Sequence, residues 1–351
     1  MAGTGLMDLV DSEYPIVGAP MAGGPTTVAL AAAVRSAGGF PLLAAGYKTA
    51  EALHDELRQA RGIGGAFGVN LFVPGSMPVD EAAFRTYADE LAPEAASHGL
   101  ELDPRPVLDD DDQWPAKVAV LLADPVPVVS LTFGLPAARD LAALRRAGSR
   151  VLATVTTAAE ARAAADAGVD ALVVQAPAAG GHSGTFDPYR PLPPVHGAGA
   201  LRAADLVREI SAAADLPMVA TGGVADARDA AELLHAGAAA VAVGTLLLRT
   251  DESGASQTHK DALADPAFTE TAITHAFTGR PARGLRNGFI ERHESTAPFG
   301  YPALHHLTRP LRQAAAKAGD PDRLHLWAGT GFRAARTGPA ADVIRKLAAG
   351  L

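Results

Sequence analysis

The sequence predicts an α/β protein, a TIM (β/α)8 barrel with a helical cap or substrate subdomain over one mouth. Three observations support this fold: short apolar runs typical of buried parallel strands, Ala-Gly pairs that end the helices before them, and glycine-rich turns after several strands. Eight strands can be placed, and eight parallel strands close a barrel. The chain has 351 residues, which is enough for one large barrel with added segments.

Four of the expected strands follow an Ala- and Leu-rich helical stretch that ends in Ala-Gly. The glycines are Gly38, Gly148, Gly168 and Gly237. Glycine just past a helix end supplies the left-handed residue that turns the chain back. The runs after these glycines are continuously apolar, as in parallel strands that are buried on both faces. The other four strands are expected at residues 15–18, 68–72, 126–131 and 217–220.

Uneven spacing of the strands divides the chain into parts. We assign residues 1–72 and 118–249 to the barrel, and residues 73–117 to an excursion from it. The acidic run at 109–112 is interpreted as a solvated turn rather than a metal site, because contiguous carboxylates rarely converge on one ion. Residues 250–325 lose the strand pattern and are expected to form the helical cap. Residues 326–351 should return to the barrel and end in a helix on its outer surface.

Composition excludes several classes of function. The net charge of −9 argues against binding to a phosphate backbone, so no nucleic-acid partner is expected. The absence of cysteine excludes disulfides, thiolate metal sites, iron–sulfur clusters and a cysteine nucleophile. No uninterrupted apolar stretch reaches the ~20 residues of a membrane-spanning helix, and the N-terminus lacks a signal-peptide pattern. We therefore expect a cytoplasmic protein with no membrane partner and no metal.

Three glycine-rich turns follow expected strands, at residues 20–25, 220–226 and 243–248. Turns without side chains expose backbone N–H groups and let a ligand approach the main chain. In TIM barrels the loops after strands seven and eight commonly form a phosphate site with a helix N-terminus. One such turn alone is more simply a tight connection, but two at successive strand ends favour phosphate binding. No GxGxxG or Walker sequence is present, which gives no support to a Rossmann or P-loop fold.

The loop after the sixth strand carries the strongest catalytic candidate. Gln175 ends the strand, and His182 follows between glycines where barrel enzymes keep catalytic groups. An imidazole there can accept a proton near neutral pH or orient an anion, although a purely local hydrogen bond is the simpler alternative. Asn70 lies within an apolar strand, so its amide either satisfies the backbone or binds a ligand. The sequence leaves that choice open.

Several segments in order along the chain resemble the nitronate monooxygenase family, formerly called 2-nitropropane dioxygenases. They are PMAGG, GVNLF, SLTFGLP, ATVTTAAEARAAADAGVDALVVQ, AGGHSG, VATGGVAD, AVGT and FTGRPARGLRN, and the resemblance runs from about residue 15 to residue 350. It implies an FMN-containing TIM barrel that oxidises alkyl nitronates, with nitroalkanes as a further substrate class, by means of O2. Carbonyl compounds and nitrite are the implied products. Barrels of this kind often form dimers, and the sequence leaves a homodimer open.

The resemblance also implies roles for single residues. His182 matches the family's active-site histidine, which would bind the nitro group or act as a base on a neutral nitroalkane. Tyr301, in the looser match HESTAPFGYP, would face the substrate. Ala242 and Val243 stand where the family often has Gln-Met or Gln-Ile, which removes an amide but keeps the backbone N–H groups. The implied FMN contacts are Met21, Ala22, Gly23, Asn70, Gln175, Gly180, Gly181, Gly222, Gly223, Ala242, Val243, Gly244 and Thr245.

Two other functions are consistent with parts of the sequence. An FMN-dependent enoyl-acyl-carrier-protein reductase of a related family shares PMAGG, AGGH and GRPAR-like motifs, and would need a nicotinamide site. A non-catalytic flavin- or phosphate-binding barrel would not need the His182 loop. An inosine-monophosphate-dehydrogenase type of barrel is excluded, because that chemistry requires a cysteine nucleophile.

Overall fold

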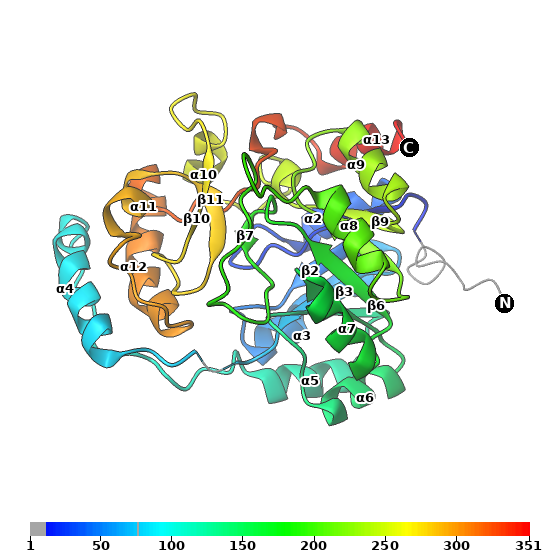
Figure 1. Ribbon diagram of the computed structural model, residues 1–351, viewed down its shortest axis with the longest axis horizontal. Coiled ribbons are helices and arrows are strands. Elements are labelled where there is room, and N and C mark those ends of the chain that lie inside the picture. The colour runs from blue at the N-terminus through cyan, green and yellow to red at the C-terminus, as the bar shows by residue number, and fades with distance from the viewer. Residues whose placement is uncertain (1–11, 76) are drawn as a thin grey trace.

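The computed structural model describes residues 12–75 and 77–351, so the first eleven residues of the predicted barrel range lie outside the described part. Eight parallel strands close a barrel in the order β1-β2-β3-β4-β5-β6-β8-β9 (Figure 1). This confirms the predicted TIM barrel, and each strand lies at or within a few residues of its expected place. The strands are β1 (Ile16–Gly18), β2 (Phe40–Ala44), β3 (Gly68–Phe72), β4 (Val128–Thr132), β5 (Arg150–Val155), β6 (Ala171–Gln175), β8 (Met218–Thr221) and β9 (Ala240–Val243).

Side chains alternate along the strands between the barrel interior and the layer under the helices. At the bottom of the interior, residues such as Val17, Phe40 and Leu152 form an apolar plug. Two residues further along several strands, the inward positions become polar at the carboxyl end. These positions are Asn70, Ser130, Thr154, Gln175 and Thr221. The barrel therefore has a solid apolar base and a polar layer beneath its upper mouth.

Helices surround the barrel and bury their apolar faces against the strands. Thr27, Thr49, Thr157 and Asp226 each accept a backbone N–H at a helix start, as expected for N-cap residues. The predicted C-terminal helix is present and buries Ile344 and Leu347. The outer helices are α2 (Val28–Ser36), α3 (Ala50–Ala60), η1 (Arg61–Ile63), α5 (Trp114–Ala123), α6 (Ala138–Arg146), α7 (Ala158–Ala167), α8 (Ala203–Ser211), α9 (Ala227–His235), η2 (Thr245–Leu247), η4 (Phe332–Ala334) and α13 (Ala340–Ala348).

The cap contains a small antiparallel sheet besides its helices. Its sheet has the order β10-β11-β7, and β7 comes from the loop after β6 rather than from the cap segment itself. The sequence predicted only helices here and left that loop irregular, so the sheet is a difference from the prediction. The cap elements are β7 (Gly181–His182), α10 (Gln257–Ala262), β10 (Thr271–Thr274), β11 (Ala282–Leu285), α11 (Gly288–His293), α12 (Ala303–Ala318) and η3 (Pro321–Arg323).

Helix α4 (Glu81–Ser97), from the segment predicted as an excursion, packs with the cap. Phe84, Tyr87 and Leu91 share one apolar core with cap residues that include Phe289, and α4 lies beside α12 at the far end of the cap (Figure 1). The Tyr87 hydroxyl donates a buried hydrogen bond to the Ala276 carbonyl, 2.8 Å away. The boundary predicted between 117 and 118 falls inside α5, which begins at Trp114.

The acidic run at 109–112 connects parts of the molecule rather than forming only a solvated turn. Asp110 Oδ2 lies 2.7 Å from His306 Nε2 on the cap helix α12. Asp112 accepts the Tyr47 N–H at 2.9 Å and pairs at 2.7 Å with Lys117, whose side chain is 1% exposed. Within the described ranges, no three or more His, Asp or Glu side chains gather as metal ligands would.

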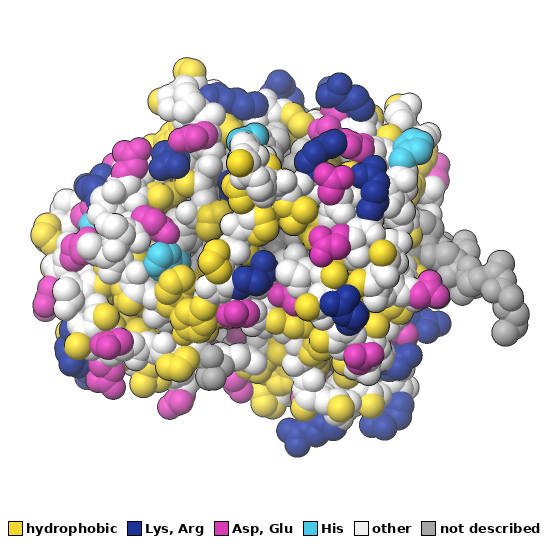
Figure 2. All heavy atoms as spheres, in the orientation of Figure 1, with side chains coloured by type: hydrophobic (Ala, Val, Ile, Leu, Met, Phe, Trp, Pro, Cys, Tyr) yellow, Lys and Arg dark blue, Asp and Glu magenta, His cyan; other side chains and the backbone are white. Residues whose placement is uncertain are grey.

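The surface seen in Figure 2 intersperses acidic and basic side chains instead of gathering one sign into a patch. None of the helices in the described residues has both the length and the apolar character needed to cross a membrane.

Candidate active site

A cavity of about 600 Å³ opens at the carboxyl ends of the barrel strands, under the cap. Its size is that of a typical pocket for a cofactor and a small substrate. Every residue predicted to contact FMN lines it, and so does His182. Tyr301 does not line it. It lies beside the cavity, with its ring 5.8 Å from that of His182 and 5.5 Å from that of Phe133.

Asn70 is anchored in the polar layer of the barrel. Its Nδ2 lies 2.9 Å from Ser130 Oγ and 3.0 Å from Thr132 Oγ1, both on the neighbouring strand β4. The two hydrogens of Nδ2 are therefore satisfied inside the barrel. Of the two alternatives left open by the sequence, internal hydrogen bonding accounts for the amide nitrogen. No described residue donates to the side-chain oxygen Oδ1 of Asn70, which remains an acceptor at the cavity wall.

Gln175 holds the loop that carries His182. Its Nε2 donates to the His182 carbonyl at 2.9 Å, and its Oε1 accepts the Gly184 N–H at 2.6 Å. The Gln175 side chain thus ties the end of β6 to the loop that follows it, up to Gly184 nine residues later. The sequence predicts Gln175 only as a ligand contact, and this positioning role is visible only in the folded structure. One Nε2 hydrogen stays available to a ligand.

The glycine turns meet where three backbone segments come close together. A Cβ at Gly180 would lie 2.5 Å from the Ala328 carbonyl carbon, and one at Gly222 would lie 2.9 Å from the Ala179 nitrogen. Only glycine fits at either position without displacing backbone. Gly222 and Gly223 also have φ of +115° and +81°, in the region that glycine favours. Helix α9 begins a few residues later, so these turns lead into a helix N-terminus.

Residues 328–331 complete this glycine-lined wall and were not predicted from the sequence as part of it. Thr245 Oγ1 accepts the Gly329 N–H at 2.9 Å, and the Thr330 N–H reaches the Ala178 carbonyl at 3.1 Å. The signal was available, since Ala328-Gly329-Thr330-Gly331 is itself a short turn of small residues. Its distance along the chain from the other turns gave no reason to place it beside them.

His182 is held in β7 as a neutral imidazole with a defined tautomer. Its Nε2 lies 2.9 Å from Thr278 Oγ1, and the Thr278 hydroxyl donates to the Arg280 carbonyl at 3.2 Å. Because the threonine proton is used there, the oxygen accepts from His182 Nε2–H, and Nδ1 keeps a free lone pair. Burial, with the nearby charges of Arg280 and Arg312, lowers the pKa of His182 to about 3. At neutral pH this residue can accept a proton but carries no positive charge.

Aromatic rings enclose His182 on three sides. Ring centroids of Phe133, Tyr301 and Trp327 lie 5.8, 5.8 and 5.5 Å from the imidazole. Phe133 has φ of +82°, a strained conformation for a side chain of that size, and the Arg280 guanidinium lies 4.0 Å from its ring centroid. These rings give the imidazole a largely apolar surround, while His182 itself is half-buried at the cavity wall.

Helix α12 forms the cap-side wall of the cavity and contributes residues that the sequence did not reveal. His305 stacks on Tyr47 with ring centroids 4.1 Å apart and an interplanar angle of 4°. Arg312 also lines the cavity, two turns further along the helix. Tyr47, His305 and Arg312 belong to segments far apart in the sequence, so only the folded cap brings them together.

Comparison with known proteins identifies the family. A sequence model of the nitronate monooxygenase family matches residues 4–350. A probable nitronate monooxygenase of Staphylococcus aureus (strain Newman) is 35% identical over 347 residues, which cover 97% of this chain and 95% of the relative.

Among solved structures, a nitroalkane oxidase from Streptomyces ansochromogenes has a TM-score of 0.91 and 49% identity, covering 99% of this chain and 98% of that one. FabK from Thermotoga maritima has a TM-score of 0.74 and 25% identity, covering 98% of this chain and 94% of that one. The chain belongs to the nitronate monooxygenase family and is an oxidoreductase.

Proposed function

We propose that the protein uses FMN to oxidise alkyl nitronates with O2, giving a carbonyl compound and nitrite. The observation that supports this most is His182, a neutral imidazole with a free Nδ1, in a cavity whose other wall is a set of glycine turns. Two nitronate anions and one O2 contain the atoms and charge of two carbonyl compounds and two nitrite ions. The overall conversion therefore balances without a further reductant.

The residues present fit FMN. A Cβ at Gly180 or Gly222 would collide with backbone, so the wall consists of bare main chain that an anionic phosphate can approach. The turns at 180–181, 222–223 and 244–245 would hold the phosphate. Asn70 Oδ1 and the second Nε2 hydrogen of Gln175 would contact the ribityl chain or ring edge, and the main chain at Met21 and Ala22 would approach the ring.

When bound, FMN supplies the electron acceptor and the reactivity with O2 that no side chain in the described chain provides. The protein's own contribution is to bind, orient and shield the substrate. His182 Nδ1 can accept the α-proton of a neutral nitroalkane or a hydrogen bond from a protonated nitronate. The rings of Phe133, Tyr301 and Trp327 keep water away from the reacting carbon. We extend the substrate role to the cap, residues 250–325 together with α4, since α12 forms the wall that faces the barrel mouth.

Anaerobic mixing of the purified protein with ethylnitronate tests this function. We expect the absorbance band of oxidised flavin, at about 450 nm, to bleach without O2. It should then recover when O2 is admitted, with release of nitrite. A flavin that keeps its full absorbance in the presence of ethylnitronate, with no nitrite formed, would contradict the proposal.

The similarity to FabK supports a second candidate, an enoyl-acyl-carrier-protein reductase that takes hydride from a nicotinamide. The same preparation separates the two functions. Rapid bleaching by NADH or NADPH, with no response to ethylnitronate, would favour the reductase.

A further inference from the structure

Arg312 is a buried cation in the wall of the cavity. It lies on α12 and is 5% exposed, whereas Arg309 and Gln313 on the same helix also line the cavity but are exposed. Arg312 therefore lies in the buried part of this wall, and Arg309 and Gln313 lie in its exposed part.

The guanidinium is fixed in place but has no acidic partner. Its Nε donates to Thr308 Oγ1 at 3.0 Å, and its Nη2 lies 2.9 Å from the His305 carbonyl and 3.2 Å from His305 Nδ1. Among the described residues no carboxylate pairs with Arg312, and no acceptor receives a hydrogen bond from Nη1. Arg292, by comparison, pairs with both Glu94 and Asp322. A buried charge without a counterion is costly to keep, so its retention points to a ligand that supplies the negative charge.

The neighbouring groups leave Arg312 as the buried charged member of this wall, because Arg309 on the same helix is exposed. Burial lowers the pKa of Arg312 to about 10, which still leaves the group protonated at neutral pH. His305 Nδ1 accepts from the guanidinium, so His305 is the neutral Nε2–H tautomer, and burial holds its pKa well below the ordinary range. His182 is also neutral. Arg280 is charged, but it donates to the Thr185 carbonyl and lies over Phe133 rather than along the cavity.

We propose that Arg312 is the specificity-determining residue that binds the anionic nitro group of a nitronate, through the unused Nη1 edge of its guanidinium. This inference rests on the proposed function for the identity of the substrate. A guanidinium presents N–H groups in a planar fork that matches two oxygens of a planar oxyanion. The nitro group of a neutral nitroalkane is also planar, but its oxygens carry less negative charge and its α-carbon is tetrahedral. Arg312 should therefore favour the nitronate anion over its neutral conjugate acid.

Binding of inorganic nitrate to the flavin-loaded enzyme provides a test that needs no turnover. Nitrate is planar, carries one negative charge and has no carbon to oxidise. We expect Arg312→Gln to weaken nitrate binding by about 10- to 100-fold in calorimetric titrations at constant ionic strength, as for loss of a charge-assisted hydrogen bond. Arg312→Lys keeps the charge without the fork and should weaken binding less. Lys317→Gln, an exposed cation at the end of the same helix, should leave nitrate affinity unchanged.

Steady-state rates then test specificity. In Arg312→Gln, kcat/KM for ethylnitronate should fall by a similar factor, while kcat/KM for nitroethane should change by less than about threefold. Equal losses for the two substrates, or wild-type nitrate affinity in both Arg312 variants, would overturn the inference and leave the proposed function intact. If nitrate binding depends on Arg312 but the enzyme does not oxidise nitronates, the proposed function would be overturned. The inference that Arg312 binds an anion would then still stand.

Discussion

The hydrogen bond between His182 Nε2 and Thr278 Oγ1 decides which nitrogen of the imidazole is available for chemistry. The threonine occupies Nε2, the Arg280 carbonyl orients the threonine, and Gln175 fixes the loop from the other side. The residue is thus positioned both by the turn that contains Thr278 and Arg280 and by the end of β6. Because the pKa of His182 is low, its imidazole stays neutral through the physiological pH range.

Replacing His182 by Asn should separate catalysis from cofactor binding. We expect kcat with ethylnitronate to fall by roughly 100-fold or more, as is usual for loss of a positioned acid–base group. Flavin content should remain that of the wild type, because His182 is held by Thr278 and not by the glycine turns. Thr278→Val should cause a smaller loss, since it frees the imidazole without removing it. Wild-type kcat in His182→Asn would exclude the assigned role.

A substitution at Gly223 tests the proposal that the glycine turns hold the FMN phosphate. The φ of +81° at Gly223 means that Gly223→Ala is strained by about 1 kcal/mol even in the free protein. Gly168, which ends α7 with φ of +83°, gives the same backbone strain at a position that does not line the cavity, and is the matched control for that strain. A Cβ at Gly223 would in addition lie 3.2 Å from the Ala178 Cβ. We expect Gly223→Ala to purify with much less flavin, whereas Gly168→Ala should retain it, as measured by absorbance per protein. Equal flavin content in both variants would place the phosphate elsewhere.

At the scale of single residues, the sequence predicted those that leave a local trace. Glycine turns and a histidine between glycines are visible without a structure, and all of them line the cavity. Arg312 leaves no such trace. It lies in an amphipathic helix like many surface arginines, and only the packing of α12 over the barrel shows that its charge is buried. Tyr47 and His305 became neighbours for the same reason.

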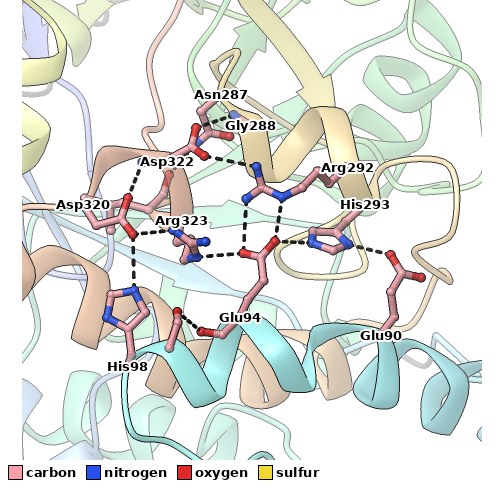
Figure 3. Close-up of polar contacts among 12 residues, drawn as sticks. Glu90, Glu94, His98, Asn287, Gly288, Arg292, His293, Asp320, Asp322 and Arg323 are labelled. Carbon is pink, nitrogen blue, oxygen red and sulfur yellow. Dashed lines mark hydrogen bonds and ion pairs between the residues drawn. The ribbon is translucent and has the colours of Figure 1, made fainter.

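Helix α4 is attached to the cap by an ion network centred on Glu94. Figure 3 shows its carboxylate between the side chains of Arg292, His293 and Arg323, which come from α11 and η3. Glu90, one turn earlier on α4, reaches the other nitrogen of His293 at 2.5 Å. Burial alone raises the pKa of Glu94, but the hydrogen bonds from Arg292 and His293 outweigh it and bring the pKa below its ordinary value.

Glu94→Gln should loosen α4 from the cap. We expect the free energy of unfolding to fall by about 2 kcal/mol, less than the ~3–5 kcal/mol of a fully buried pair because Arg292 reaches solvent. The matched control is Glu81→Gln, at the exposed start of α4, where the pair with Arg85 at 3.3 Å should contribute less than about 0.5 kcal/mol. Urea unfolding measures both. Equal effects would mean that the network does not anchor the helix.

At the scale of elements, the barrel strands were predictable because each is a continuous apolar run after a turn. Strands β10 and β11 were not, since four residues such as TAIT or ARGL carry no period. They pair with each other, and β11 also pairs with β7, which has only two residues. Helix α4 did carry a signal, with Phe84, Tyr87 and Leu91 at helical spacing, but its partner surface is formed by residues about 190 positions later. Periodicity predicts an element and does not say what it packs against.

Across the described chain, four histidines at or near the cavity are buried or half-buried and are held neutral. Burial lowers the pKa of His182 to about 3 and that of His259 to about 4, and moves those of His305 and His325 well below the ordinary value of 6.5. In the unfolded chain all four would take up a proton near pH 6.5. His275 acts in the opposite direction: burial lowers its pKa, but the hydrogen bond with Glu294 outweighs this and raises it.

Stability should therefore fall as the pH drops from 7 to 5. A group with a lowered folded-state pKa contributes stability fully above its unfolded value of 6.5 and loses it as the pH falls toward its folded value. At pH 5 the loss is about 2 kcal/mol each for His182 and His259. Urea unfolding at the two pH values measures the sum, and His259→Gln should make the decline about 2 kcal/mol smaller. His235→Gln, on the exposed side of α9, should leave the decline as in the wild type. A wild-type stability that is flat between pH 7 and 5 would mean that these imidazoles gain access to water, and with it a proton, without unfolding.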